Sequence, residues 1–492
     1  MYELLEGIIQ HACEIPGAIL RRVGKGMVVS MKRILLKIYF GLPVILQNLA
    51  ISLYGLLLYQ QRYTGVYKKY LRKYAADGHG DAIKEKRIQN RKFLHLLHYA
   101  VTASPFYREF YKDIDLEQIK SVDDIEKLPI LTKDILKDNI DRIYTVPKRG
   151  SLIFLTGGTT GTPLAVRKRK TDVRKRMAYL DAYKLTFGFY NNKMKSARFF
   201  GKKIVEDNPG KPIFWRNNYV SRQRLYSTYH LTEENIAYYV ADLNRYKPAS
   251  IDGFVSAIFC IARYMESNGM KLSFTPKAVF TTSETVLPYH RETIERVFGC
   301  PLSDQYASNE GAPFIVQCRC GSYHEAIDTG VFEHLERDGA TRLLVTGFDT
   351  FGTPLIRYDI GDVILPLTEK KSCACNSSHP VIEGISGREA AFLMTGKSKV
   401  SQVQLSVFIS SLSELVVQMQ FIQKKDGSIH VIAVPGGKET AEERAEAFEE
   451  LLLALREFFG REANITLEYR DSPYLLKSGK FQLVLKEEWL LR

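Results

Sequence analysis

Apolar and polar positions alternate along most of the chain with the periods of helices and short strands. Helical spacing runs over about residues 85–112 and 116–140, and a strand-like run follows at Ser151–Leu155. Helices and strands then alternate to about residue 300, and residues 341–349 and 355–366 again have the pattern of strands. Such alternation is typical of an α/β fold. We therefore expect a large α/β domain that begins after residue 80.

The last hundred residues predict a second, smaller α/β unit. Strands are expected at Leu415–Ile422, His430–Val434 and Asn464–Tyr469. The amphipathic stretch Thr440–Phe458 predicts a helix before the last of these strands. No internal repeat is found, so the chain is read as separate domains and not as a repeat array.

The first 80 residues have a different pattern, in which apolar and basic segments alternate. Residues 38–61 form a run of 24 without a charged side chain, which is long enough to cross a bilayer. Polar residues interrupt the run, and Asn48, Ser52 and Gly55 fall near one face of a helix. Three alternatives stay open: helices that cover a soluble core, a basic amphipathic hairpin on an anionic membrane, or a true span.

The composition indicates a globular chain with an excess of positive charge. Of 492 residues, 45% are apolar and 25% are charged, which excludes a disordered chain. The net charge is +14, and residues 1–75 hold eleven basic residues against three acidic ones. An anionic partner is therefore indicated: a nucleotide, a nucleic acid or a membrane surface. The chain opens without a signal peptide, and its seven cysteines do not fit a secreted disulfide framework, so we expect a cytoplasmic location.

A loop rich in glycine and threonine follows the first predicted strand. From Leu155 to Pro163 it reads Leu-Thr-Gly-Gly-Thr-Thr-Gly-Thr-Pro. Glycines let the backbone approach an anion closely, and threonine hydroxyls donate to phosphate oxygens. The loop lacks the Gly-Lys-Ser/Thr ending of the Walker pattern. The basic cluster Arg167–Arg176 just beyond it is typical of a solvated charged face.

Four further segments follow this loop in a characteristic order. They read Asp-Gln-Tyr-Ala-Ser-Asn-Glu-Gly at 304–311, Arg-Tyr-Asp-Ile-Gly-Asp at 357–362, Gly-Arg-Glu at 387–389 and Ser-Gly-Lys-Phe at 478–481. Together the five segments resemble the motifs of the adenylate-forming superfamily, which contains acyl-CoA synthetases, luciferases and peptide-synthetase adenylation domains. The resemblance extends over roughly residues 85–492.

Within that superfamily the chain is most similar to the phenylacetate-CoA ligase branch. The segments Thr353–Tyr358 and Ser104–Arg108 resemble that branch, and the basic first 80 residues are most like its capsular polysaccharide biosynthesis members. The resemblance implies three parts. Residues 1–80 form a basic amphipathic helical extension, 81–386 a large multi-sheet adenylation domain with zinc-bound loops, and 387–492 a small mobile α/β lid that carries the catalytic lysine.

The resemblance also implies a role for each matched residue. Lys480 is the expected catalytic lysine, which bridges carboxylate and α-phosphate oxygens, and Glu310 is the expected Mg²⁺ ligand and second catalytic residue. Tyr306 is expected to pack on adenine, Asp362 to accept from the ribose hydroxyls, and Arg388 to place a cation near the ribose or phosphate. The full expected nucleotide-binding set is Thr156, Gly157, Gly158, Thr159, Thr160, Gly161, Ser283, Glu284, Tyr306, Ser308, Asn309, Asp362 and Arg388.

Three features depart from the family pattern or leave it open. Asn309 stands where the family usually has Ser or Thr, so an amide replaces one hydroxyl. Glu389-Ala390-Ala391 replaces the usual acidic residues that include the hinge, so adenylation is better supported than transfer to CoA. Ser283-Glu284-Thr285 resembles the adenine-side loop, or else it caps the helix expected near Pro288.

Two Cys/His clusters predict a metal site. Cys-Arg-Cys-Gly-Ser-Tyr-His occupies 318–324 and Cys-Ala-Cys-Asn-Ser-Ser-His occupies 373–379. Thiolate and imidazole are the ligands of tetrahedral structural Zn²⁺. The spacing in related ligases favours four ligands and leaves Cys320 and His379 as alternates, and free cytosolic thiols are the other interpretation. The favoured ligands are Cys318, His324, Cys373 and Cys375.

The leading hypothesis is an ATP-dependent ligase that forms an acyl-AMP and pyrophosphate from a carboxylic acid. The acyl group then passes to a thiol, amine or hydroxyl, in surface polysaccharide biosynthesis. ATP, Mg²⁺ and structural Zn²⁺ are the expected cofactors, and CoA or a carrier-lipid-linked sugar is the expected acceptor. Residues 1–75 predict peripheral contact with the inner face of the cell membrane.

Three alternatives remain at this level. The first is an aryl- or acyl-CoA ligase of small-acid metabolism, and the second is a non-catalytic nucleotide-binding scaffold. The third is a nucleic-acid-binding zinc protein, but the basic residues concentrate outside the Cys/His segments, so no nucleic acid is expected.

Overall fold

The computed structural model of the chain describes most of the sequence, in the segments given at the end of this paragraph. The predicted phosphate loop, residues 156–163, the first 33 residues and the predicted hinge residues 389–391 lie outside the described residues. The described segments are 34–77, 80–155, 164–337, 340–367, 373–388, 393–395, 398–400, 402–412, 415–416, 418–435, 440–460, 462–476 and 479–490.

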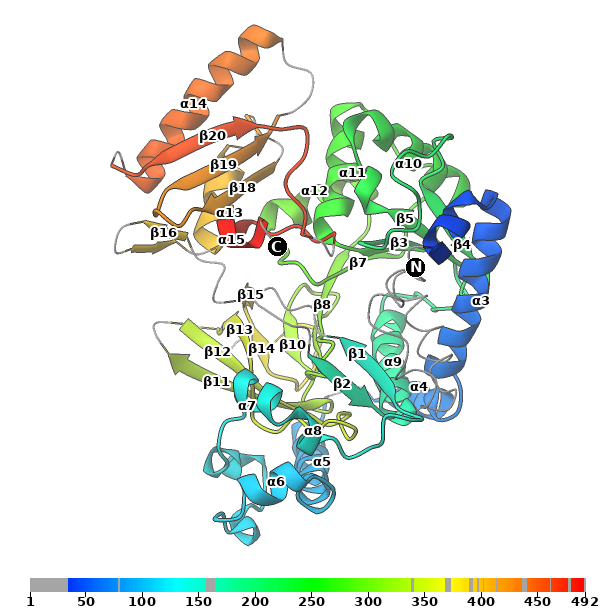
Figure 1. Ribbon diagram of the computed structural model, residues 1–492, viewed down its shortest axis with the longest axis vertical. Coiled ribbons are helices and arrows are strands. Elements are labelled where there is room, and N and C mark those ends of the chain that lie inside the picture. Colours follow the sequence, from blue (N-terminus) through cyan, green and yellow to red (C-terminus); the bar gives the residue numbers. More distant parts are fainter. Residues whose placement is uncertain are drawn as a thin grey trace.

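A mixed sheet of nine strands forms the centre of the large domain (Figure 1). Its order is β14-β10-β9-β8-β7-β6-β3-β5-β4. Strands β5, β3, β6, β7 and β8 are parallel, so their carboxyl ends meet at one edge of the sheet. The strands are β3 (Ser196–Phe200), β4 (Trp215–Asn218), β5 (Gln223–Ser227), β6 (Ser250–Gly253), β7 (Ala278–Thr282), β8 (Leu302–Tyr306), β9 (Ile315–Gln317), β10 (Tyr323–Glu325) and β14 (Val381–Ile382).

Helices cover both faces of this sheet because each face is apolar. One apolar cluster joins the sheet to α10 (Glu233–Tyr246), α11 (Val255–Ser267) and α12 (Pro288–Phe298). A second cluster, rich in Tyr and Phe, joins it to α4 (Tyr67–Ala76) and α9 (Lys170–Leu185). Helix α10 has the bounds expected from the sequence, since Thr232 precedes it in extended conformation and the left-handed Lys247 ends it.

A second, antiparallel sheet lies beside the first and has the order β11-β12-β13-β15. It shares a core with the helices that precede the predicted phosphate loop. Its strands are β11 (Gly330–Arg337), β12 (Ala340–Gly347), β13 (Tyr358–Leu365) and β15 (Gly384–Arg388), and a separate hairpin of β1 (Leu152–Leu155) and β2 (Ala165–Lys168) flanks the loop.

The two long helices expected before residue 140 are broken in the structure. Ser104 and Pro105 divide the first into α5 (Ala82–Ala103) and α6 (Pro105–Phe110), because the Ser104 side chain caps a new helix with proline at its first position. The second prediction, over 116–140, is wrong as a single helix. Local capping side chains divide it into short pieces: η2 (Leu116–Gln118), η3 (Val122–Lys127), α7 (Lys133–Asp138) and α8 (Ile140–Ile143).

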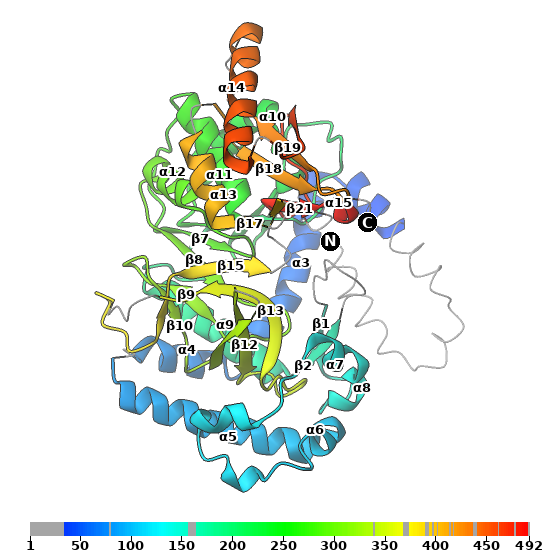
Figure 2. The same cartoon turned by 90° about the vertical axis from the view of Figure 1, so that its left-hand side faces the viewer.

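The C-terminal segment forms its own α/β unit (Figure 2). The apolar core of this unit also includes Leu287 of the large domain. Its four-stranded sheet has the order β20-β19-β18-β21, and all three strands and the helix expected there are present. Its elements are β16 (Leu393–Thr395), β17 (Ser398–Val400), α13 (Gln402–Ser411), β18 (Gln418–Gln423), β19 (Ile429–Val434), α14 (Ala441–Phe459), β20 (Ile465–Tyr469), β21 (Val484–Lys486) and α15 (Glu487–Leu490).

The described part of the N-terminal extension is helical. Residues 34–41 are helical, and Pro43 then precedes α3 (Val44–Arg62). Helix α3 runs along β4 at the edge of the large sheet (Figure 1). No helix among the described residues is both long and apolar enough to cross a membrane. The predicted fold class is confirmed: a large multi-sheet α/β domain, a small C-terminal α/β domain and a helical N-terminal extension.

Candidate active site and metal centre

The predicted nucleoside residues come together where the two sheets meet. Tyr306 ends β8, and its hydroxyl donates to Asp362 Oδ2 on β13 at 2.6 Å. Asp362 in turn lies opposite Arg388 in the β13–β15 register. The structure thus brings together the Tyr306 ring, the Asp362 carboxylate and the Arg388 backbone, which are far apart in the sequence. This proximity is what the prediction of a single nucleoside site requires.

The loop after Tyr306 is fixed by its own side chains. Ser308 Oγ accepts from the backbone N–H groups of Gly311 (3.2 Å) and Ala312 (3.1 Å). Asn309 Nδ2 donates to the carbonyl of Leu155 at 3.0 Å, the last residue before the predicted phosphate loop. The residue that departs from the family pattern therefore ties this loop to the end of β1. Glu310, the expected Mg²⁺ ligand, is buried with 7% of its surface exposed.

Two buried cations lie behind this loop. Lys168 Nζ lies 4.5 Å from the centroid of the Phe154 ring, and a Cβ on Gly311 would lie 3.9 Å from it. Arg176 Nη1 donates to the Gly311 carbonyl at 3.1 Å. Burial, together with the charge of Arg176, lowers the pKa of Lys168 to about 7. The charge of Glu310 opposes this shift. The expectation of a solvated basic face is wrong at these two positions.

The loop that carries Lys480 is a tight turn of the C-terminal domain. Leu476 N–H donates to the Lys480 carbonyl at 3.0 Å, and Gly479 N–H donates to the Leu476 carbonyl at 2.7 Å. Gly479 has φ +72, and a Cβ there would lie 2.7 Å from Gly201 Cα of the large domain. The turn therefore requires glycine for its conformation and for its close approach.

Lys480 reaches the carboxyl edge of the large sheet. Its Nζ lies 6.0 Å from the centroid of the Phe254 ring, and its charge acts on the buried Glu284 carboxylate. Gly201 follows β3, Phe254 follows β6, Glu284 follows β7 and Tyr306 ends β8. Because these adjacent parallel strands end at one edge, Lys480 lies at the same edge as the predicted adenine contact.

Glu284 holds the two domains together. Its carboxylate accepts from Ser256 N–H (2.9 Å) and Ser256 Oγ (3.1 Å) in the large domain and from Phe481 N–H (2.6 Å) in the C-terminal domain. Burial raises the pKa of Glu284 to about 7, although these hydrogen bonds and Lys480 lower it. The neighbouring Ser283 has φ +73, and Leu287 is the N-cap of α12, so the capping alternative is wrong. The adenine contact of both residues stays a prediction.

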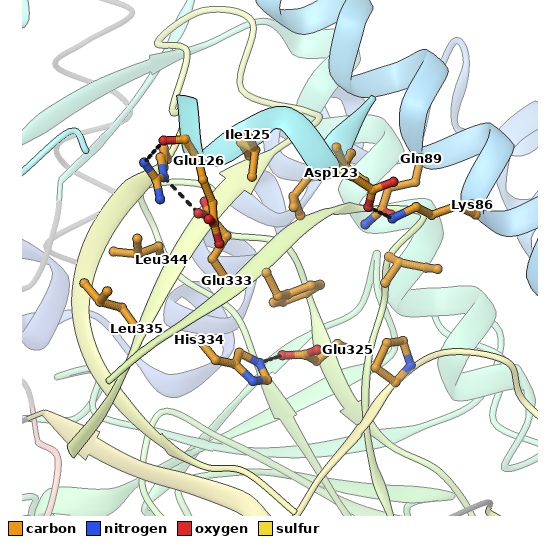
Figure 3. Close-up of a pocket in the computed structure, with 16 residues that line it drawn as sticks. Lys86, Gln89, Asp123, Ile125, Glu126, Glu325, Glu333, His334, Leu335 and Leu344 are labelled. Carbon is orange, nitrogen blue, oxygen red and sulfur yellow. Dashed lines mark hydrogen bonds and ion pairs between the residues drawn. The ribbon is translucent and has the colours of Figure 1, made fainter. Parts of the chain in front are cut away.

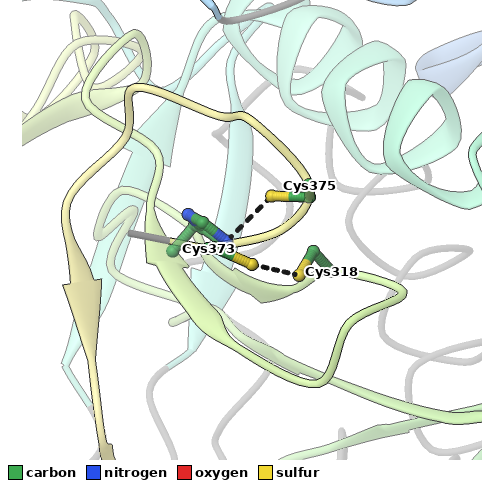
Figure 4. Close-up of side chains that lie close together, drawn as sticks. Cys318, Cys373 and Cys375 are labelled. Carbon is green, nitrogen blue, oxygen red and sulfur yellow. Dashed lines mark hydrogen bonds between the residues drawn. The ribbon is translucent and has the colours of Figure 1, made fainter. Parts of the chain in front are cut away.

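The four favoured metal ligands form one cluster in which all ligand atoms lie within 4.8 Å of one another (Figure 4). Cys318 Sγ and Cys373 Sγ are 3.5 Å apart, and Cys375 Sγ lies 3.3 Å from His324 Nε2. Ligand atoms around tetrahedral Zn²⁺ are separated by about 3.5–3.8 Å, given the usual metal–ligand distances. The donor set and its spacing therefore fit a structural zinc ion.

The surroundings of the cluster orient its ligands. His324 Nδ1 lies 3.2 Å from the carbonyl of His379, which favours the tautomer whose Nε2 is free to bind a metal. Burial raises the pKa of Cys373, but hydrogen bonds from Ser322, the Cys375 backbone and His324 lower it to about 6, which favours a thiolate. Cys320 is exposed, although it interacts with Cys318 and Cys373, and neither it nor His379 belongs to the group of four.

The sequence comparison gives a close relative over nearly the whole chain. Protein CapK of Staphylococcus aureus is 35% identical over 446 residues, which is 90% of this chain and 97% of that protein. The chain belongs to the CapK family. A family model described as the CapK C-terminal domain matches residues 392–487, the unit that carries Lys480. The predicted likeness to the capsular polysaccharide members is thereby confirmed.

Solved structures give the fold of this CapK family member. A 2-hydroxyisobutyryl-CoA ligase in the postadenylation state, in complex with R3-HIB-AMP, has a TM-score of 0.66 at 16% identity and covers 84% of this chain and 91% of that chain. That ligase in the thioesterification state, in complex with 2-HIB-AMP and CoA, has a TM-score of 0.52 at 16% identity, with 82% and 90% covered. The fold of adenylate-forming ligases is thus confirmed.

A cavity of about 520 Å³ lies elsewhere in the large domain, between η3, α5 and β11 (Figure 3). Most of its charged side chains pair with one another: Lys86 with Asp123 at 2.7 Å, Arg357 with Glu333 at 2.8 Å, and His334 with Glu325 at 2.6 Å. None of the predicted site residues lines it, so it gives no reason to place the active site there.

Proposed function

We propose that this CapK family member is an ATP-dependent ligase that joins a carboxylic acid to AMP and releases pyrophosphate. The observation that carries the proposal is the position of Lys480. The C-terminal domain brings this lysine to the carboxyl edge of the large sheet, beside Phe254. Phe254 follows β6, and a single strand, β7, separates β6 from β8, which ends at Tyr306. A lysine far from that edge could not contact a nucleotide bound there, and it would therefore have no role in the reaction.

The expected site residues would supply the contacts that adenylation requires. The carboxylate and the triphosphate repel each other, so the site must neutralise negative charge as the α-phosphate is attacked. Lys480 Nζ would place a cation between the two reacting groups. Glu310 would hold Mg²⁺, which withdraws charge from phosphate oxygens when it is bound. Tyr306 and Asp362 would hold adenine and ribose, and the loop 156–161 would hold the phosphates.

The family supports the setting of the reaction. The relative from Staphylococcus aureus is named CapK, which supports the expected setting in surface polysaccharide biosynthesis. The acyl acceptor remains a proposal of a thiol, amine or hydroxyl. CoA and a carrier-lipid-linked sugar are the two acceptors to compare. The 2-hydroxyisobutyryl-CoA ligase that this chain resembles in fold has been solved with CoA bound, which supports CoA as one of them.

Adenylation is tested by ATP–pyrophosphate exchange with a panel of aliphatic, aromatic and sugar carboxylic acids. We expect exchange that depends on Mg²⁺ and on one class of acid, with formation of an acyl-AMP detected by mass spectrometry. A folded, zinc-loaded protein that binds ATP but exchanges pyrophosphate with no acid of the panel contradicts the proposal. That result would favour a non-catalytic nucleotide-binding scaffold.

Lys168, which belongs to none of the five sequence motifs, gives a second prediction about the adenylation reaction. We expect Lys168→Met to lower exchange about tenfold, mainly through a higher KM for ATP, because it removes a buried positive charge beside Glu310. Steady-state exchange at varied ATP measures the effect. Lys170→Met is the matched control, because Lys170 is exposed two residues further on. Equal KM values for the two folded variants would show that Lys168 has only a structural role.

We also propose that the Cys/His cluster holds one structural Zn²⁺. With four protein ligands such a site has no open position for a substrate. Cys318 and His324 belong to the β9–β10 hairpin, whereas Cys373 and Cys375 precede β14 and then β15. The metal would therefore fasten the loop that follows Glu310 to the segment that enters the C-terminal domain.

A further inference from the structure

Helix α3 packs against the large domain with its polar face. Gln47, Asn48 and Ser52 are buried, with 3–6% of their surface exposed. Asn48 Oδ1 accepts from Asn217 N–H at 2.8 Å, and Ser52 Oγ accepts from Tyr219 N–H at 3.0 Å. These bonds satisfy backbone groups at β4, which has no further strand beside it.

The polar face of α3 fits closely against the β4 region of the large domain. A Cβ added to Gly55 would lie 2.3 Å from Asn218 Oδ1, so a larger residue there would have to displace the Asn218 side chain. Arg216 Nε also donates to Gln47 Oε1. The helix is therefore held in one orientation about its axis, and its opposite face is fixed toward the outside.

That outer face is apolar. Ile45, Leu49, Leu53 and Leu56 follow at intervals of three or four residues and expose 79%, 53%, 58% and 42% of their surface. Seven of the seventeen large apolar side chains that are exposed in the described part of the chain lie between residues 34 and 56. A helix on a water-facing surface normally has the reverse arrangement. This apolar face of α3 therefore needs an apolar partner.

The charge of the N-terminal part of the sequence selects the partner. From residue 15 to residue 76 the sequence contains eleven basic side chains and no acidic one. Lys37 is exposed before the helix, and Lys68 and Lys69 are exposed beyond it. Two copies of this chain would bring like charges together, whereas an anionic lipid surface attracts all of them. Tyr219, which is 64% exposed beside Ser52, adds an amphipathic ring of the kind found at bilayer interfaces.

We propose that α3 docks the enzyme on an anionic lipid bilayer, with the helix lying in the plane of the membrane and its outer face inserted. A helix of 19 residues would lie along about 28 Å of the surface. In Figure 1, α3 runs along the right-hand edge and the C-terminal domain lies at the upper left, so docking leaves that domain uncovered. The attachment does not depend on the reaction that the site performs.

Vesicle sedimentation with the full-length protein tests the docking surface. Vesicles of phosphatidylcholine with phosphatidylglycerol are compared with phosphatidylcholine alone, at low and high salt. We expect binding to the anionic vesicles only, weakened by salt, and at least about tenfold weaker for the double variant Leu49→Gln/Leu53→Gln. Leu453→Gln is the matched control, because Leu453 is a 59% exposed leucine on α14, and it should bind as the unaltered chain does.

Three outcomes overturn the proposal. The first is no sedimentation of the full-length chain with anionic vesicles at low salt. The second is equal binding by the double variant and the control. The third is a dimer in light scattering that the double variant converts to monomer, since a second copy would then cover the face. Exchange activity measured without vesicles should be unchanged in the double variant, so failure of the docking and failure of the adenylation proposal are distinguishable.

Discussion

Lys480→Ala is expected to lower acyl-AMP formation about 10²–10³-fold while the protein stays folded, because it removes the cation aimed at charge that develops in the transition state. The turn that carries Lys480 does not depend on its side chain. Backbone bonds between Leu476 and Gly479 form the turn, and Phe481 N–H anchors it to Glu284. The C-terminal domain should therefore still dock, and the loss should appear in kcat.

The measurement is ATP–pyrophosphate exchange, with circular dichroism and thermal unfolding as checks of the fold. Lys425→Ala is the matched control, because Lys425 is an exposed lysine of the same domain in the turn between β18 and β19. A folded Lys480→Ala protein with near-normal exchange would exclude the assigned mechanism. Equal losses in both variants would indicate that the domain as a whole had been disturbed.

Loss of the metal centre has the second large expected effect. About one Zn²⁺ should copurify per chain, and the double variant Cys373→Ser/Cys375→Ser should lose it. We expect its unfolding temperature to fall by about 5–10 °C, because the binding energy of a structural site is folding energy. Hydrogen bonds lower the pKa of Cys373 and favour its thiolate, the form that binds zinc.

Cys320→Ser is the control for this experiment. Cys320 lies in the same turn but is exposed and outside the cluster, so its variant should keep both the zinc and the unfolding temperature. Elemental analysis of freshly purified, unchelated protein measures the metal. Absence of zinc from the unaltered chain, or its retention in the double variant, would contradict the assignment of the ligands.

Glu284 connects the two halves of the site in a way that its motif did not indicate. The sequence suggested an adenine contact or a helix cap, yet its carboxylate bridges Ser256 and Phe481. No local pattern could have predicted this, because Phe481 is 197 residues away. A buried carboxylate held by donors from two domains can only be recognised once both domains are in place.

Much of the architecture was contained in local sequence. Helix α10 has its predicted bounds because capping and helical period act over a few residues. The strands and the helix of the C-terminal domain were predicted for the same reason. The order of the five motifs indicated the superfamily. Two C-x-C pairs with nearby histidines gave six candidate ligands, and the spacing in related ligases favoured the four whose ligand atoms the fold brings within 4.8 Å of one another.

The tertiary structure decided which faces and charges are buried. The sequence allowed residues 38–61 to cover a core, lie on a membrane or span it, and only the contact with β4 turned the polar stripe of α3 inward. Lys168 and Arg176 belong to a basic cluster that is typical of a solvated face. Both are buried, because Gly311, more than a hundred residues away, lies against them. Helical period fixes which residues share a face, whereas the partner of that face depends on distant segments, and a single chain's local pattern carries no record of them.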